Sequence, residues 1–482
     1  MAGTSAITAS SNSASTTAPV SVASNTSSGA AGGSVINVSS LVSQLVAAEL
    51  APQQTLISNQ TQAVTAQVSA LGTLQGALST FQSALSSLDS PTAFNTQVAT
   101  SSQNTSFTAL AGSSANAGTY NVVVNNLASA QQLVSGALSS TGSVGDGTLQ
   151  ISLGGQSFDV TVGPGSDTVS AIAAAINSAS ANPGVEASVI QGSDGAHLLL
   201  TSAATGAANT ISVTETDSGG GLAALTYGSG NTANYTQSAK ALDASFSVAG
   251  VPQTSASNTI TNAVSGVTLT LLSPTTGTGG TLTVANDTTT VQKNIDAFVS
   301  AYNTLQSSMA SLGSYDASSG TAGAMEGNPV LTGTQRTIQN VLYSFVGTSA
   351  YNSLASIGIT TNSDGSLSVN DTTLQTALQT NFSAVSNLFS SANGIATQLN
   401  TQITNTLSSA GTIGNYATTL QTQENSLTTQ SNNLQTQTTA LTASLTQQYS
   451  ALNALLSSLQ TTSSQLSQTF ATLPTVQGTP NA

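Results

Sequence analysis

Residues 420–441 read LQTQENSLTTQSNNLQTQTTAL, and leucine occupies every seventh position of this stretch, at Leu420, Leu427, Leu434 and Leu441. A seven-residue apolar repeat is typical of a helix that packs along another helix in a coiled coil. Coiled coils usually carry Glu and Lys beside the apolar seam, whereas this stretch has one charged residue, Glu424. Glu424, Ser431 and Thr438 also occupy the second seam position. We therefore expect a marginal helix that becomes ordered only when a partner adds apolar surface.

The same spacing continues downstream and recurs near the start of the chain. Four further leucines occupy the other seam position of the final helix, with Leu455 at the first: Leu445, Leu452, Leu459 and Leu466. Upstream, two interleaved sets are also seven apart: Ile57, Val64, Leu71, Leu78 and Leu85, and Leu74, Phe81 and Leu88. A shorter helix should precede them, capped by Asn37 or Ser39 and broken or kinked at Pro52. Its apolar stripe is Leu41, Leu45, Val46 and Leu50.

From about residue 94 the apolar period changes to two, which indicates strands. The stretch TLQISLGGQSFDVTV (148–162) predicts a hairpin about Gly154-Gly155, and strands should follow at 185–190, 197–202 and 244–273. One helix interrupts them at 167–179, with Asp167 as its cap. The helical period returns at Val291. Helices are expected at 291–309 and around 330–346 and 371–390, with a hairpin at 357–369.

These patterns predict a multidomain α+β protein, in which β-rich head domains are inserted into a terminal α-helical coiled-coil or bundle stalk. Residues 1–33 hold almost no bulky apolar residue and should form a disordered tail. We assign 34–56 and 420–482 to a terminal coiled-coil leg, and 57–92 and 290–419 to a helical bundle domain. A β-rich head domain should comprise 93–136 and 238–289, and an inserted outer β-rich head domain with one helix should comprise 137–237.

The composition excludes several kinds of partner. The 482 residues include three Lys and Arg against 17 Asp and Glu, for a net charge of −14. Nucleic acid and anionic lipid are therefore not expected to bind, because both require clustered cations. Cysteine is absent, so no disulfide or thiolate metal site is expected. The first residues lack the features of a cleaved signal peptide, and no apolar run is long enough for membrane insertion.

Candidate chemistry is sparse. The one histidine, His197, follows Asp194, but no positioned serine or oxyanion site accompanies it, so a structural role is the better interpretation. The stretch TTNSDGSLSVND (360–371) resembles a calcium loop at Asn362, Asp364, Gly365 and Asp371, although a hairpin turn at Asp364-Gly365 explains it better. The remaining carboxylates are scattered. We expect no catalytic residue, no cofactor and no metal, and we do not expect an enzyme.

An ordered set of segments resembles one known family. INVSSLVSQLVAAELAP (36–52), AGTYNVVVNNLASAQQLVSG (117–136), the 244–273 segment and QQYSALNALLSSLQTTSSQLSQTF (447–470) resemble flagellar hook-associated protein 2, the filament cap family. Residues 148–209 resemble a repeat inserted in flagellins and related axial proteins. The chain departs from the family in charge, because Gln53, Gln54 and Gln253 stand where relatives carry basic residues. Subunit contacts that are salt bridges in relatives must therefore be made differently, and the oligomer number is not carried over.

The resemblance implies a flagellar filament cap, which forms a homo-oligomeric ring at the filament tip and promotes folding and insertion of exported flagellin. It implies flagellin, hook-associated junction proteins and an export chaperone, bound through the C-terminal helix, as partners. It also implies an extracellular location after export by the flagellar type III apparatus without a cleaved signal. The alternatives are another axial component, such as a flagellin-like filament or hook-junction subunit, and an adhesin whose β-rich head binds host mucin or glycans. The expected leg interface is Leu41, Leu45, Leu427, Leu434, Leu441, Leu452, Leu459 and Leu466.

Overall fold

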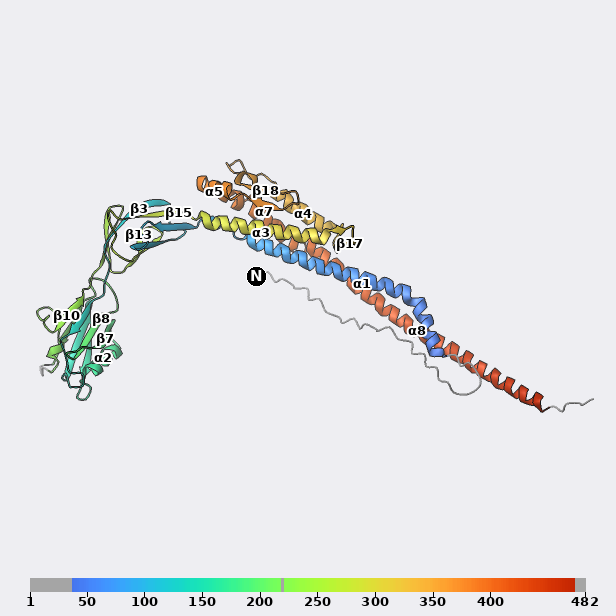
Figure 1. Ribbon diagram of the computed structural model, residues 1–482, viewed down its shortest axis with the longest axis horizontal. Helices are drawn as coiled ribbons and strands as arrows, with labels where there is room; N and C mark the ends of the chain where they lie inside the picture. The colour runs from blue at the N-terminus through green and yellow to red at the C-terminus, as the bar shows by residue number, and fades with distance from the viewer. Residues whose placement is uncertain (1–36, 218–220, 473–482) are drawn as a thin grey trace, which may run out of the picture. The chain divides into compact units, whose positions relative to one another are not determined.

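The computed structural model describes residues 37–217 and 221–472, so the tail predicted at 1–33 lies outside the described residues (Figure 1). The chain divides into two compact units. The first unit holds residues 37–89, 294–377 and 387–472, and the second holds 90–293 and 378–386. The prediction of a multidomain α+β fold, with β-rich parts inserted between helical ends, is confirmed.

Helices form most of the first unit. They are α1 (Val38–Leu85), α4 (Pro329–Leu342), α7 (Ile395–Leu407), α8 (Thr412–Ala471) and parts of α3 (Thr288–Gly313), α5 (Asp371–Thr380) and α6 (Phe382–Ser390). A 3-10 turn, η3 (Ala355–Ile357), and two hairpins accompany them: β16 (Tyr315–Asp316) with β17 (Thr321–Ala322), and β18 (Ile359–Thr361) with β19 (Leu367–Val369). An aromatic cluster lies in the core, where the ring centroid of Phe81 is 5.7 Å from that of Phe298 and 5.9 Å from that of Tyr302.

Helix α1 continues through Pro52, so the break that the sequence analysis allowed there does not occur. The helix runs from Val38 to Leu85 with Pro52 inside it, and Figure 1 shows it bending toward its N-terminal end. Proline removes one helical hydrogen bond and can bend a helix without ending it, and residues 51–56 around Pro52 are all exposed. Asn37 caps the helix as predicted, because its Oδ1 accepts from the backbone N–H of Ser40 at 3.1 Å.

The second unit contains two separate hydrophobic clusters. Around one cluster lie a five-stranded sheet in the order β1-β15-β3-β11-β12 and a three-stranded sheet in the order β13-β14-β2, all antiparallel. The strands are β1 (Gln97–Ser101), β2 (Phe107–Ala111), β3 (Gly118–Asn126), β11 (Ala244–Val248), β12 (Val251–Ser255), β13 (Thr259–Val264), β14 (Val267–Leu271) and β15 (Gly280–Asn286). A short 3-10 helix, η1 (Pro91–Phe94), precedes them.

The other cluster lies among a four-stranded sheet in the order β10-β4-β8-β7, a three-stranded sheet in the order β6-β5-β9, and helix α2 (Val169–Ser178). The strands are β4 (Gln132–Ser135), β5 (Gly147–Leu153), β6 (Gln156–Val162), β7 (Val185–Gln191), β8 (Ala196–Ser202), β9 (Ile211–Glu215) and β10 (Tyr235–Ala239), with η2 (Ala223–Leu225) before β10. The predicted β5–β6 hairpin is confirmed. Its turn needs Gly154 and Gly155, whose φ angles are +58° and +89°.

Two sequence predictions are wrong in detail. The cap of α2 is Thr168 rather than Asp167, because the hydroxyl of Thr168 accepts from the N–H of Ala171 at 3.3 Å. The helix expected around 371–390 is two helices, α5 and α6, because Asn381 interrupts it. The side chain of Asn381 accepts from the N–H of Ala384 at 3.1 Å and so caps α6. Helix α7 and the β16–β17 hairpin were not predicted from the sequence.

Candidate assembly interface along the terminal helices

Helices α1 and α8 pack side by side and run in opposite directions (Figure 1). Neutral side chains make polar contacts between α1 and two later helices, α7 and α8. Gln82 donates from its amide to Asn400 Oδ1 and to Thr404 Oγ1, both at 2.8 Å, and the hydroxyl of Tyr416 donates to Gln67 Oε1 at 3.4 Å. Amide and hydroxyl groups thus make these contacts within the chain, with no charged side chain among them.

The leucines predicted for the leg interface fall into three groups along α8. Leu427 is buried, with 7% of its surface exposed, and its heptad neighbour Leu420 is 1% exposed. Leu434 and Leu441 are half-buried. Leu452, Leu459 and Leu466 are 45%, 57% and 57% exposed. The single chain therefore buries only the first part of the predicted seam.

On α1 the structure buries a neighbouring pair of residues instead of the predicted one. Leu41 and Leu45 are 37% and 43% exposed, whereas Val42 and Val46 are 1% and 5% exposed. One residue corresponds to a rotation of about 100° around a helix, so this shift moves the packed stripe to an adjacent face. The i, i+4 spacing of Val42 and Val46 was a signal for this face, but the larger leucines masked it.

The last part of α8 carries apolar side chains that no described residue covers. Every residue from 454 to 472 is exposed, including Leu455, Leu456 and Phe470. No charged side chain occurs in this stretch or in the part of α8 that leads to it from Asn425. A contiguous exposed apolar stripe on a helix marks an interaction site. This stripe is the candidate functional surface of the chain.

The surroundings of His197 support a structural role. Its Nδ1 lies 2.7 Å from the backbone oxygen of Ser135, and its Nε2 lies 3.0 Å from Asp194 Oδ1. Both ring nitrogens face acceptors, an arrangement that favours the doubly protonated ring. The hydrogen bond to Ser135 and then the one to Asp194 raise the pKa of His197. The pair fastens the β7–β8 turn to β4, and the hydroxyl of Ser135 is engaged elsewhere, with the N–H of Leu198 and the carbonyl of Gly136.

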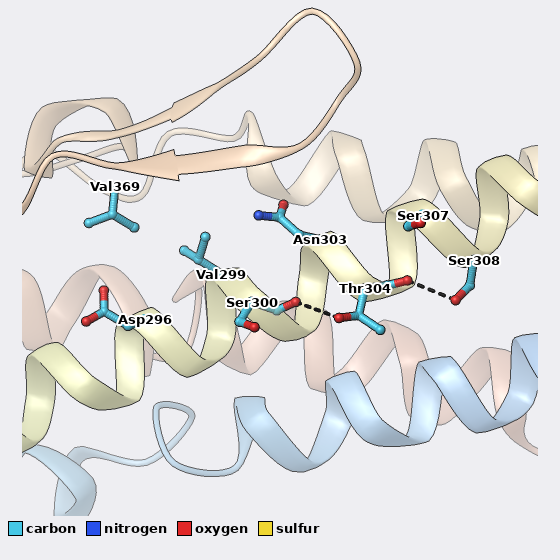
Figure 2. A pocket seen from close by; sticks show the side chains of 8 residues that line it. All are labelled: Asp296, Val299, Ser300, Asn303, Thr304, Ser307, Ser308 and Val369. Carbon is cyan, nitrogen blue, oxygen red and sulfur yellow. Dashed lines mark hydrogen bonds between the residues drawn. The ribbon is translucent and has the colours of Figure 1, made fainter.

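A groove of about 610 Å³ runs along α3 beside β19, lined by Asp296, Val299, Ser300, Asn303, Thr304, Ser307, Ser308 and Val369 (Figure 2). Its polar groups largely bond to the protein itself. Asn303 exchanges two hydrogen bonds with the backbone of Leu367, and the hydroxyls of Thr304 and Ser308 donate to backbone oxygens one turn earlier. Burial, and then the nearby Asp371, raises the pKa of Asp296. These groups are arranged as a helix surface rather than as a catalytic set.

The 360–371 stretch forms the predicted hairpin, with β18 and β19 paired and Gly365 at φ +81°. The carboxylate of Asp364 accepts from the N–H of Ser366 at 2.9 Å and from its hydroxyl at 2.6 Å. Within the described residues, no group of three or more His, Asp or Glu side chains could hold a metal ion. No described helix is both long enough and apolar enough to cross a membrane.

Helices at both ends, β-rich parts between them and an apolar stripe left open on α8 are typical of a chain that assembles with other chains. Residues 34–131 match the family model of the flagellar hook-associated protein 2 N-terminus, and residues 241–461 match that of its C-terminus. Residues 148–204 match the flagellin hook IN motif. The chain belongs to the flagellar hook-associated protein 2 family.

Relatives agree with this assignment. Flagellar hook-associated protein 2 of Escherichia coli K12 is 34% identical over 400 residues, which cover 79% of this chain and 84% of the relative. The B-type protein of Pseudomonas aeruginosa is 29% identical over 381 residues, covering 74% of this chain and 80% of the relative. The crystal structure of the D1-D2-D3 domains of the Escherichia coli flagellar cap protein aligns with a TM-score of 0.57 at 33% identity, covering 73% of this chain and 99% of that one. The family resemblance read from the sequence is confirmed.

Proposed function

We propose that this chain is a flagellar filament cap, which forms a homo-oligomer at the filament tip and promotes folding and insertion of exported flagellin. Membership in the hook-associated protein 2 family supports a role in the flagellum. The observation that carries the proposal is the open apolar stripe at the end of α8, from Leu452 to Phe470. Such a stripe is costly in water and becomes favourable when other chains cover it.

Several parts of the proposal follow from the family. The protein would be exported by the flagellar type III apparatus and act outside the cell. It would contact flagellin and the hook-associated junction proteins, and an export chaperone would bind its C-terminal helix before export. The division of the helical ends into a leg (34–56, 420–482) and a bundle (57–92, 290–419), with two β-rich heads, is part of this proposal. We assign the protein no catalytic chemistry, since its work is to position other chains.

The flagellin hook IN motif at 148–204 favours a second candidate, another axial component such as a filament subunit. The two candidates differ in what they form, because a cap gives a closed oligomer and a filament subunit gives an open-ended polymer. Light scattering of the purified chain over a concentration series separates them. Binding of mucin or glycans by the β-rich head remains a prediction that a glycan array can test.

The proposal that the chain is a filament cap can be tested by complementation of a strain in which the gene for this protein is deleted. The wild-type chain should restore filaments, whereas the deletion strain should release unassembled flagellin into the medium. A double variant, Leu452→Asp and Leu466→Asp, should not restore filaments, because each carboxylate would have to enter an apolar contact unpaired. Gln468→Asp is the matched control, because it adds the same charge at another exposed position of α8. Full motility of the double variant, or failure of the wild-type chain, would argue against the proposal.

A further inference from the structure

Strand β6 forms one edge of the sheet β6-β5-β9, and among the described residues no strand pairs with its outer side. Leu153 and Gln156 flank the two-residue turn of the β5–β6 hairpin. In such a hairpin the flanking residues form a hydrogen-bonded pair, and every second residue beyond them bonds to the partner strand. The residues in between direct their backbone N–H and C=O groups away from β5, and these are Ser157, Asp159 and Thr161.

The outward backbone groups of β6 have no hydrogen-bond partner in the part of the chain that the structure describes. Ser157, Asp159 and Thr161 are also exposed, whereas Phe158 and Val160 between them are buried. The strand runs for seven residues without a register shift. A regular, uncovered edge of this length is a template on which another strand can pair.

Strand β7, an edge of the other sheet around the same hydrophobic cluster, is covered by two asparagine side chains. The amide of Asn177 donates to the carbonyl of Ala187 at 2.7 Å and accepts from its N–H at 2.8 Å. Asn182 makes the same two bonds with Val185, both at 2.7 Å. These side chains occupy the positions that a further strand would need.

Three further edges of the second unit are interrupted or partly covered. On β12 the outward position nearest the turn is Pro252, which has no N–H to offer. On β9, Val213 exchanges two backbone hydrogen bonds with Tyr227, at 2.7 and 2.8 Å. On β10 a register shift breaks the ladder between Gln237 and Ala239. Edges of this kind resist pairing with another chain, and β6, all of which the structure describes, shows none of these features.

The one charged side chain on β6 determines which kind of strand fits against it. Asp159 is exposed, its Oδ1 accepts from Gln150 Nε2 at 3.2 Å, and no described Lys or Arg forms an ion pair with it. Two β6 strands paired antiparallel about their centres would place two Asp159 carboxylates opposite each other, which is destabilising. The net charge of −14 on each copy adds to that repulsion. A basic side chain opposite Asp159 is favourable instead.

We propose that the edge of β6 is a docking site for an extended segment of another protein, which adds a strand to this sheet and sets a basic side chain opposite Asp159. Main-chain hydrogen bonds to the outward groups of β6 supply the affinity, and the basic residue supplies selectivity. The residues on either side of the basic one face the same way as Phe158 and Val160, toward the hydrophobic cluster, and are therefore apolar. The inference stands apart from the cap proposal, because β6 belongs to the second unit and α8 to the first.

A synthetic peptide of the sequence SVTVKVTVS is a suitable probe, because its lysine shares one face with serine and threonine while the valines share the other. The matched control, SVTVEVTVS, differs only in carrying glutamate at the centre. Hydrogen exchange of the full-length chain, read by mass spectrometry, should slow at residues 156–162 by at least about threefold with the lysine peptide and much less with the glutamate peptide. Equal protection by the two peptides, or none at 156–162, would overturn the inference.

Variants of the chain test the edge and the charge separately, with the affinity read from the fluorescence anisotropy of labelled peptide. Thr161→Pro removes one outward N–H, as Pro252 does on β12, and should weaken binding of the lysine peptide at least about tenfold. Asp159→Asn, which leaves the strand intact, should weaken it about two- to fivefold. Glu186→Gln makes the same change of charge at an exposed position of the covered strand β7 and should have no effect.

Two outcomes would assign the edge differently. If residues 156–162 become protected as the concentration of the chain rises in the absence of peptide, a second copy is the occupant and the inference fails. If Glu186→Gln weakens binding as much as Asp159→Asn does, the lysine peptide responds to net charge rather than to β6, which also contradicts the inference.

Discussion

Truncation of Leu427 to alanine should loosen the α1–α8 pair, whereas the same truncation at Leu459 should leave it intact. Leu427 is 7% exposed and Leu459 is 57% exposed on the same helix. A buried Leu→Ala change costs about 2–5 kcal/mol, and the lower end, about 2–3 kcal/mol, applies here because a two-helix seam can partly collapse around the missing atoms. A largely exposed leucine costs about 0.5 kcal/mol or less.

Hydrogen exchange read by mass spectrometry is the appropriate assay, because a chain of two units does not unfold as a single two-state system. A loss of about 2–3 kcal/mol corresponds to about 30- to 150-fold faster exchange of the amides at 420–434. Leu459→Ala should change the same amides by about twofold or less in dilute, monomeric protein. The strands of the second unit provide an internal control in both variants. Unchanged exchange in Leu427→Ala, or an equal effect of Leu459→Ala, would refute the pairing.

Three further predictions concern pH, salt and a turn. The pKa of His197 is raised from 6.5, so the stability that this group adds to the folded state is fully present below pH 6.5 and is lost as pH rises through the higher folded pKa. The pKa of Asp194 is lowered from 3.8, so the stability that its carboxylate adds is lost as pH falls below 3.8. Asp194→Asn should therefore lower the melting temperature more at about pH 5 than at about pH 8, and the opposite order in calorimetry would contradict the geometry. An increase in sodium chloride from about 0.05 to about 1 M should not lower the melting temperature of the wild-type chain. The three Lys and Arg offer few ion pairs for salt to screen, and salt reduces the repulsion among the charges that give a net charge of −14. A clear fall in the melting temperature would be inconsistent with this reasoning. Gly266→Ala should speed exchange in β13 and β14 by about tenfold or more, because φ is +72° and the new Cβ would lie 2.6 Å from the nitrogen of Ala115. Gly250→Ala, at φ +82° with open space around it, is the matched control and should cost less in its own hairpin, β11–β12.

Much of the fold could be predicted because its elements carry local signals. The β5–β6 hairpin follows from two glycines between alternating strands, and α3 follows from Ile295, Phe298 and Tyr302 on one face. The interruption between α5 and α6 was harder, since an asparagine inside a helical pattern caps a new helix only when packing fixes the preceding chain. Helix α7 was missed because its apolar stripe is short, with Ile395, Leu399 and Ile403 as its large buried residues.

The sequence predicted an apolar interface on the terminal helices, and the structure changed which residues the chain itself buries there. The heptad leucines of α8 were identified from spacing, but spacing does not tell which of them an internal partner covers. Leu427 is buried and Leu459 is open because α1 begins at Val38 and so reaches only part of α8. The structure buries Val42 and Val46 where the sequence predicted Leu41 and Leu45. This difference also depends on the partner helix, since the face that packs depends on how two helices cross.

The sequence by itself determined that the chain has long helices at both ends, strands between them, almost no charge on the helices and an apolar seam in need of partners. These properties depend on local periodicity and composition, which a single chain carries in its order of residues. Only the tertiary structure decided where the intramolecular seam stops and an open one begins. That boundary depends on the length and alignment of a helix about 370 residues away in the chain, and no local pattern in α8 encodes where a distant partner ends.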